Sequence, residues 1–146
     1  AVEYARKSST PFLGICLGLQ VSIIEFCRNV LNWENANSTE FNDNTPYPVV
    51  IYMPEISKTH LGGTMRLGSR KTIINDKNSL ASRLYHGLDY IYERHRHRYE
   101  VNPDFMNQIE SAGMKFVGKD DTSQRMEIIE LKNHPFLLPP APRTQH

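Results

Sequence analysis

The residues with the clearest chemical potential lie in the segment 14–20 (GICLGLQ), where Cys16 stands between Gly14 and Gly18. A short apolar run precedes the segment and a helix-like pattern follows it, so the expected order is strand, sharp turn, helix. A nucleophile flanked in this way by two glycines is typical of a nucleophile elbow, which lifts the side chain above the edge of a sheet. We expect the glycines to leave room for the backbone to pass close to neighbouring elements.

This context favours a reactive thiol at Cys16. The partial positive charge at the start of the following helix stabilises a thiolate, and the amide of Leu17 points to where an oxyanion would form. The alternative is that Cys16 is a small buried hydrophobe, as most free cysteines are. Cys27 fits that description, because it lies on the apolar stripe of the same helix.

The elements that must position these residues can be read from hydrophobic spacing. Leu19, Ile23, Phe26 and Val30 predict an amphipathic helix of about four turns. The segment 12–15 reads as a strand covered on both faces of a parallel sheet. Further helices are predicted at 2–7, 79–85 and 103–109, and extended segments at 48–53, 65–74, 90–101, 116–117 and 126–131. A glycine-rich turn is predicted at 60–63, and the polar segment 33–44 is expected to be irregular.

Four segments together resemble the class I glutamine amidotransferases, namely 14–20, 35–41 (NANSTEF), 61–68 (LGGTMRLG) and 93–102 (ERHRHRYEVN). They occur in this order in the glutaminase domain of the CTP synthase family. The resemblance implies an α/β fold of three αβα layers with a mostly parallel central sheet, truncated here at both ends. It divides the chain into a partial amidotransferase domain at 1–136 and an atypical proline-rich tail at 137–146, where no regular strand or helix is expected.

The resemblance also implies roles for individual residues. Cys16 would attack the side-chain amide of L-glutamine, with the amide of Leu17 in the oxyanion hole. The segment Leu17, Gly18, Leu19 and Gln20 would line the glutamine site. Glu40 and Arg98 would hold the ammonium and carboxylate groups of the substrate, which is reasonable chemistry for a zwitterion. From sequence alone Glu40 would otherwise be taken for a solvated surface charge.

Partners and cofactors follow from the same resemblance. Ammonia would pass to a synthase domain that uses ATP and Mg²⁺ to aminate UTP to CTP, and the full-length protein would be a homo-oligomer, a tetramer. No metal or cofactor is expected in this chain. The net charge of +1 gives no reason to invoke nucleic acid or an anionic membrane. No apolar run approaches 18 residues, so no membrane span is expected, and the two cysteines suit a reduced, cytoplasmic protein.

A catalytic base is missing from the pattern. In this family a histidine, oriented by a glutamate two residues further on, serves the cysteine. None of the six histidines is followed by glutamate at that spacing. The upstream glycine-rich loop that supplies a second oxyanion amide is also absent. Two hypotheses remain open: the chain is part of a working enzyme and inactive alone, or it is a catalytically incomplete glutamine-binding or regulatory module.

The run of alternating arginines and histidines at 94–98 has competing interpretations. A nucleic-acid patch is disfavoured by the flanking Glu93 and Glu100. A metal pair of His95 and His97 is disfavoured by the interleaved arginines, which would repel a dication. If the stretch is extended, the arginines share one face and the histidines the other. We then expect Arg94 and Arg96 to form local ion pairs with carboxylates.

Overall fold

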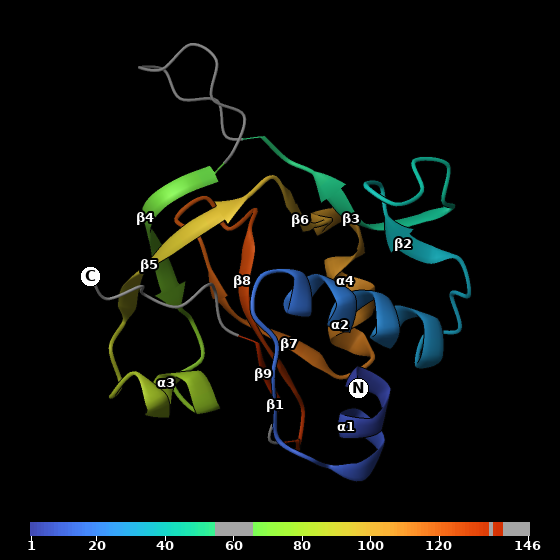
Figure 1. The fold of residues 1–146 in the computed structure, drawn as a ribbon. Helices are drawn as coiled ribbons and strands as arrows, with labels where there is room; N and C mark the ends of the chain where they lie inside the picture. Colours follow the sequence, from blue (N-terminus) through green and yellow to red (C-terminus); the bar gives the residue numbers. More distant parts are fainter. Residues whose placement is uncertain (55–65, 135, 139–146) are drawn as a thin grey trace.

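The computed structural model describes residues 1–54, 66–134 and 136–138, and for 136–138 only the backbone (Figure 1). The glycine-rich turn predicted at 60–63 lies outside the described residues, as do positions 139–146 of the proline-rich tail. Of the family motif at 61–68, only its last three residues are described.

The N-terminal third has the predicted order of elements. Helix α1 (Val2–Ser8) leads into the short strand β1 (Phe12–Leu13), and after a sharp turn α2 (Leu17–Asn29) begins. The apolar stripe of α2 is buried, including Ile23 and Cys27, neither of which is exposed. The Arg6 guanidinium donates to the Glu25 carboxylate at 2.7 Å, so an ion pair links α1 to α2.

Six strands form the main sheet, in the order β1-β9-β8-β7-β4-β5. Their bounds are β4 (Arg66–Ile74), β5 (Tyr90–His97), β7 (Met114–Lys119), β8 (Met126–Leu131) and β9 (Phe136–Leu138). The prediction of a mostly parallel sheet is wrong: β1 and β9 pair in parallel, and the other four pairings are antiparallel. For one of these pairings the reason is local: the connection between β7 and β8 is too short for a crossover, so the two strands can pair only in the antiparallel direction.

The structure contains a second sheet, which the sequence analysis did not predict, although two of its strands lie in segments predicted to be extended. Strand β3 (Tyr47–Tyr52) pairs in parallel with β2 (Ala36–Ser38) and antiparallel with β6 (Tyr99–Val101). The segment 90–101 was predicted as one extended stretch, but it bends at Arg98 and contributes β5 to one sheet and β6 to the other. Strand β2 lies in the segment predicted to be irregular.

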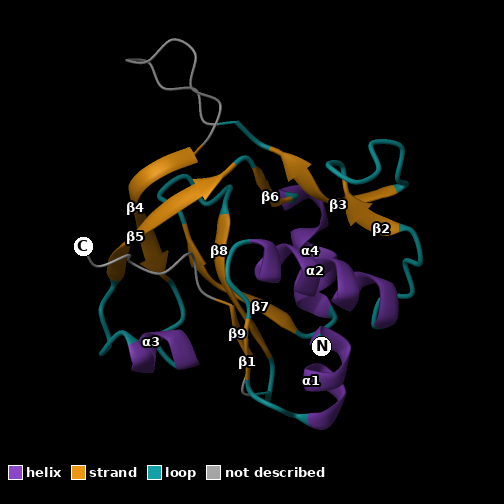
Figure 2. Ribbon diagram, in the orientation of Figure 1, coloured by secondary structure: helices purple, strands orange, loops and turns teal. Residues whose placement is uncertain are grey.

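Helices cover both faces of the main sheet, as the three-layer prediction requires (Figure 2). Neighbouring residues of the central strands face opposite ways: Phe116 and Ile129 join the core under α2 and α4 (Met106–Ser111), which also holds Ile109. Val117 and Ile128 join a smaller core under α3 (Leu80–Leu84). A turn of 3₁₀-helix, η1 (Pro103–Phe105), leads into α4.

The boundary predicted at 136 falls inside an element. Strand β9 begins at Phe136 and continues through Leu138, so the expectation that no strand forms beyond 136 is wrong for two residues. Its partners β1 and β8 supply the backbone hydrogen bonds that local composition could not reveal. Within the described residues, no helix is both long and apolar enough to cross a bilayer.

Candidate active site

Cys16 sits at the turn between β1 and α2, in a backbone conformation that side chains rarely adopt. Its φ is 55° and its ψ is −104°, and non-glycine residues with positive φ tend to occur at functional sites. The amide of Gly18 donates to the carbonyl of Ile15 at 2.9 Å, which closes the turn. Cys16 therefore projects from the start of α2, partly exposed, in the geometry that the elbow pattern predicts.

Gly18 does not have the packing role that was expected of it. A Cβ atom built at this position meets nothing within 4 Å, and its φ is not positive. The expectation of a close backbone approach at Gly18 is therefore wrong.

An open pocket of about 370 Å³ brings together five of the predicted site residues: Cys16, Leu17, Gln20, Glu40 and Arg98. They come from the start of α2, from the turn after β2, and from the bend between β5 and β6. Its volume lies within the range of small-molecule sites. The tertiary structure thus joins segments that are far apart in the sequence.

The two predicted charges of the pocket are accessible. The side chains of Glu40 and Arg98 are exposed, and neither has an ion-pair partner in the part of the chain that the structure describes. The backbone around them is anchored, since the amide of Glu40 donates to the Ser38 hydroxyl at 3.2 Å and the Arg98 carbonyl accepts from the amide of Met53 at 2.9 Å. The Glu40 carboxylate and the Arg98 guanidinium therefore both line this pocket, and hydrogen bonds hold the backbone of each residue in place.

The amide of Leu17 has the position expected of an oxyanion donor. Leu17 is the first residue of α2, and the first four amides of a helix have no intrahelical acceptor. Gly18 donates to the Ile15 carbonyl and Gln20 donates to the Cys16 carbonyl at 3.2 Å, whereas the amides of Leu17 and Leu19 have no hydrogen-bond partner among the described residues. Of the other predicted residues, Leu19 is buried and lines a second, smaller cavity beside this pocket. Gly18 is not among the described residues that line the pocket or the smaller cavity.

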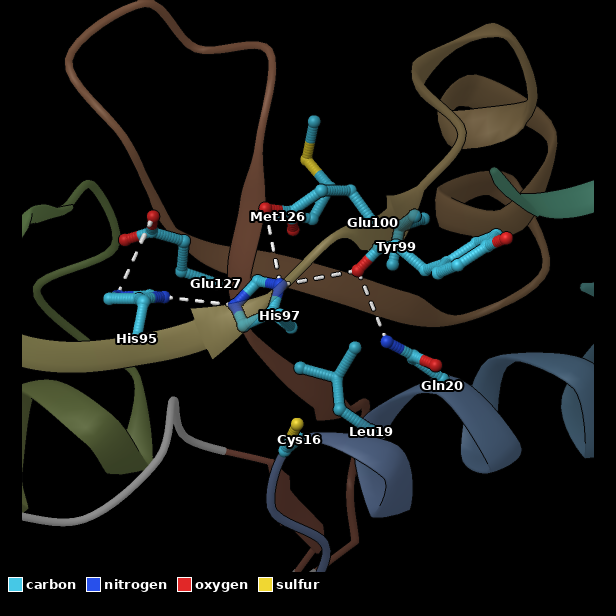
Figure 3. A pocket seen from close by; sticks show the side chains of 10 residues that line it. Cys16, Leu19, Gln20, His95, His97, Tyr99, Glu100, Met126 and Glu127 are labelled. Atoms are coloured by element: carbon cyan, nitrogen blue, oxygen red, sulfur yellow. Dashed lines mark hydrogen bonds and ion pairs between the residues drawn. The ribbon is translucent and has the colours of Figure 1, made fainter. Parts of the chain in front are cut away.

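This second cavity, of about 30 Å³, adjoins the first, and Figure 3 shows the side chains that line it. Cys16, Gln20, His97 and Tyr99 line both cavities. The rest of its wall is Leu19, Val101, Met126 and three ionisable residues, His95, Glu100 and Glu127. The inner wall of the site therefore contains ionisable side chains beside apolar ones, which the sequence analysis did not predict.

His95 and His97 form a hydrogen-bonded chain in this wall. His95 Nδ1 lies 3.0 Å from His97 Nε2, and His97 Nδ1 lies 3.2 Å from the carbonyl oxygen of Tyr99. Burial, with nearby Arg66 as the next cause, lowers the pKa of His95 to about 3 and that of His97 to about 4. Both imidazoles are therefore neutral at physiological pH.

The alternation that was expected for this segment is confirmed. Ile91, Glu93 and His95 are buried, whereas Arg94 and Arg96 are exposed. The expected ion pairs of these two arginines do not form with any residue in the described part of the chain. The predicted alternation was the signal that could have marked the histidines as part of the site, because it places them on the face opposite the exposed arginines. Among the described residues, no group of three potential metal ligands occurs.

A buried cluster of charges surrounds the histidine pair. Arg66 is 3% exposed and pairs with Glu127 at 2.6 Å, with Glu100 at 3.8 Å and with Asp120 at 3.9 Å. Arg125 pairs with Glu100 at 3.0 Å. Burial raises the pKa of both Glu100 and Glu127 to about 7, although the arginines favour their ionised forms.

A family model described as Glutamine amidotransferase class-I matches residues 1–137. The chain belongs to the class I glutamine amidotransferase family. Within this family, the chain is 57% identical over 141 residues to the CTP synthase of Dictyostelium discoideum and 53% identical over 138 residues to CTP synthase 1 of Homo sapiens. These matches cover 93% and 94% of this chain but only 25% and 23% of the relatives, so this amidotransferase spans about a quarter of their length.

A solved structure supports the same placement. The Trypanosoma brucei CTPS glutaminase domain with bound acivicin is 35% identical to this amidotransferase chain, with a TM-score of 0.84 over 94% of this chain and 53% of that one. The predicted family and the α/β class are thus confirmed, and the region corresponds to the glutaminase part of CTP synthases. The parallel content of the sheet is the part of the fold prediction that fails.

Proposed function

We propose that this chain is the glutamine-hydrolysing part of a CTP synthase, with Cys16 as the nucleophile. The observation that carries the proposal is the convergence of Cys16 in its elbow, the Leu17 amide, Glu40 and Arg98 on one pocket. The Cys16 thiolate adds to the amide carbon of glutamine, and the resulting oxyanion accepts a hydrogen bond from Leu17. The C–N bond then breaks as the nitrogen takes up a proton from water and leaves as ammonia, and a water molecule hydrolyses the remaining thioester to glutamate and frees the Cys16 sulfur.

Recognition of glutamine follows from the two accessible charges. The Glu40 carboxylate suits the α-ammonium group of the substrate, and the Arg98 guanidinium suits its α-carboxylate. Charge-assisted hydrogen bonds of this kind contribute roughly 1.5–3 kcal/mol each. That the trypanosomal relative binds acivicin supports a ligand in the corresponding place.

A base for Cys16 is not evident among the described residues. His97 is the histidine that lines both cavities beside Cys16, but both of its ring nitrogens are engaged, one by Tyr99 and the other by His95. We therefore propose that this chain alone can acylate its cysteine but is inactive in steady-state turnover. The same observation favours the second candidate, a module that binds glutamine without turning it over.

The remaining roles concern the longer protein. We propose that the ammonia passes to a synthase domain outside these residues, where ATP and Mg²⁺ activate UTP for amination to CTP. We propose in addition that the full-length protein is a cytoplasmic homotetramer. These proposals rest on the CTP synthase relatives, which are about four times as long as this chain.

Covalent labelling by a glutamine-like chloroketone tests the proposal. Cys16 is partly exposed, whereas Cys27 is fully buried and burial raises the pKa of its thiol to about 12. Mass spectrometry should find one modified cysteine in the parent chain and in Cys27→Ser, and none in Cys16→Ser. Equal labelling of both thiols would show that Cys16 is not activated.

A turnover assay separates the two candidates. An enzyme part whose cysteine is acylated but not regenerated releases about one equivalent of ammonia and almost no glutamate, whereas a pure binding module binds glutamine and releases neither product. Rapid turnover by the 146-residue chain would contradict the assignment of a missing base. Cys16→Ser is the control, since it retains the binding charges but lacks the nucleophile.

A further inference from the structure

The carbonyl oxygen of Tyr99 is the point at which the buried wall meets the catalytic turn. Gln20 Nε2 donates to this oxygen at 3.1 Å, and His97 Nδ1 lies 3.2 Å from it. The amide of the same Gln20 donates to the Cys16 carbonyl at 3.2 Å. A series of hydrogen bonds therefore links the Cys16 backbone to His97 through Gln20 and Tyr99. Figure 3 shows its bonds from Gln20 to Tyr99 and from Tyr99 to His97.

The Tyr99 carbonyl determines which ring nitrogen carries the proton in His97 and, in turn, in His95. A carbonyl oxygen can only accept, so His97 Nδ1 must carry the proton that faces Tyr99. In a neutral ring His97 Nε2 is then an acceptor, and His95 Nδ1 must donate to it across 3.0 Å. The remaining nitrogen, His95 Nε2, has no hydrogen-bond partner and faces Glu127 at 3.9 Å.

The surroundings favour this one arrangement. Around the pair lie Arg66 and Arg70 from β4, Glu100 from β6, and Arg125 and Glu127 at the start of β8. A charged His97 would place a cation near Arg66 and Arg125, whereas a neutral one satisfies both of its hydrogen-bond neighbours. The order of donors is therefore fixed in one direction, from His95 toward Tyr99.

We infer that His97, supported by His95, is a positioning residue that holds the Tyr99 carbonyl and, through Gln20, the Cys16 turn in its reactive conformation. The inference rests on the proposed role of Cys16 as a nucleophile. Cys16 occupies a strained φ, and such a conformation persists only where surrounding contacts enforce it. Loss of the His97 bond leaves the Tyr99 carbonyl with one donor and relaxes that enforcement, so the thiol is misplaced while the binding charges stay in position.

Two substitutions at His97 separate positioning from packing. In His97→Asn the side-chain amide nitrogen takes the place of Nδ1, so the donor to Tyr99 is kept and the contact with His95 is lost. In His97→Gln the longer side chain reaches toward the place of Nε2, so the contact with His95 is kept and the donor to Tyr99 is lost. Both variants delete the ring equally. His86→Asn, at an exposed histidine outside the network, is the matched control.

The measurement is the saturation kinetics of Cys16 labelling by the glutamine-like chloroketone on the full 146-residue chain. We expect His97→Gln to lower the maximal labelling rate roughly 5- to 10-fold, the effect of one lost hydrogen bond, with half-saturation unchanged within about 2-fold. His97→Asn should fall clearly less than His97→Gln, because it keeps the donor to Tyr99 and loses only the contact with His95, and His86→Asn should stay near the parent rate. Equal rates for His97→Gln and the parent, or an equal fall in His97→Gln and His97→Asn, would overturn the inference.

Nitrogen NMR of the imidazole rings supplies a readout that does not depend on labelling. We expect both histidines to be neutral at pH 7 with the proton on Nδ1. A proton on Nε2 of His97 would overturn the inference even if labelling is normal. If the proposed function itself is wrong, the chloroketone should not label Cys16 even in the parent chain. That result differs from the one that would overturn the role of His97.

Discussion

Cys16 and Cys27 show how position decides the chemistry of one residue type. They lie on the same helix region, 11 residues apart, but Cys27 packs within the core and Cys16 stands before the first helical turn at a strained φ. A buried thiol with a pKa near 12 is inert, whereas a partly exposed thiol beside free helix amides can react. The difference comes from the surroundings of each side chain.

Arg98 offers a test of substrate recognition by a single side chain. Arg98→Ala should raise the half-saturation concentration of the glutamine-like chloroketone on the order of 10-fold or more, because a charge-assisted hydrogen bond is lost. Its maximal labelling rate should change little. Arg96→Ala removes a similar exposed charge two residues away, outside the pocket, and serves as the control. Equal effects of the two variants would show that general positive charge, rather than Arg98, attracts the ligand.

The packing of β7 against β8 depends on the absence of a side chain at Gly118. The pairing register shifts at this residue, and a Cβ atom there would lie 2.8 Å from Cγ1 of Ile128, which is fully buried. Contacts this short require the neighbouring strand to move. Gly118 is therefore the position where the central antiparallel pair is most sensitive to added volume.

Gly118→Ala should lower the free energy of unfolding by about 1–3 kcal/mol, the usual cost of overpacking a core. The same substitution at Gly18 should be neutral or raise it by roughly 0.5 kcal/mol, because alanine favours the helix and its Cβ meets open space. Denaturant unfolding of the two variants and the parent measures both effects. A stable Gly118→Ala variant would show that β8 shifts easily away from β7.

The buried charges act on the molecule as a whole, because they join the two sheets. Arg66 belongs to β4 of the main sheet, and its partner Glu100 belongs to β6 of the second sheet. Buried ion pairs contribute little net stability but specify one arrangement. Their protonation should therefore be visible in the pH dependence of unfolding.

The two histidines and the two glutamates with shifted pKa values change the free energy of unfolding in opposite directions as the pH rises. The pKa values of His95 and His97 are lowered from 6.5, so their contribution to stability is present above pH 6.5 and is lost as the pH falls toward 4 and 3. The pKa values of Glu100 and Glu127 are raised from 4.5 to about 7, so their contribution is present below pH 4.5 and is lost as the pH rises through 7. Between pH 4.5 and 6.5 the two pairs offset each other.

Glu127→Gln should break this balance. With only Glu100 left to oppose two histidines, the free energy of unfolding should rise with pH between 4.5 and 6.5, by about 1 kcal/mol per pH unit relative to the parent. Denaturant titrations at several pH values in this window measure the slope. Glu110→Gln, at an exposed carboxylate of α4, should keep the parental slope. Parallel curves for Glu127→Gln and the parent would show that Glu127 is ionised in the folded protein.

The features that depend on near neighbours could be predicted from the sequence. The strand, turn and helix around Cys16 follow from residues within a few positions, and the alternation of buried histidines and exposed arginines in β5 follows from the geometry of one strand. The family was evident from four short motifs. The residues proposed for the glutamine site came from that resemblance, and five of them meet in one pocket.

Only the tertiary structure decided which distant groups meet. Gln20 and Tyr99 are 79 positions apart, yet their hydrogen bond joins the catalytic turn to the histidine pair. The antiparallel order of the main sheet, the strand β2 and the continuation of β9 also depend on partners elsewhere in the chain. Burial sets the charge of His95, His97, Glu100 and Glu127, and burial is a property of everything packed around a side chain, which local composition and spacing do not encode.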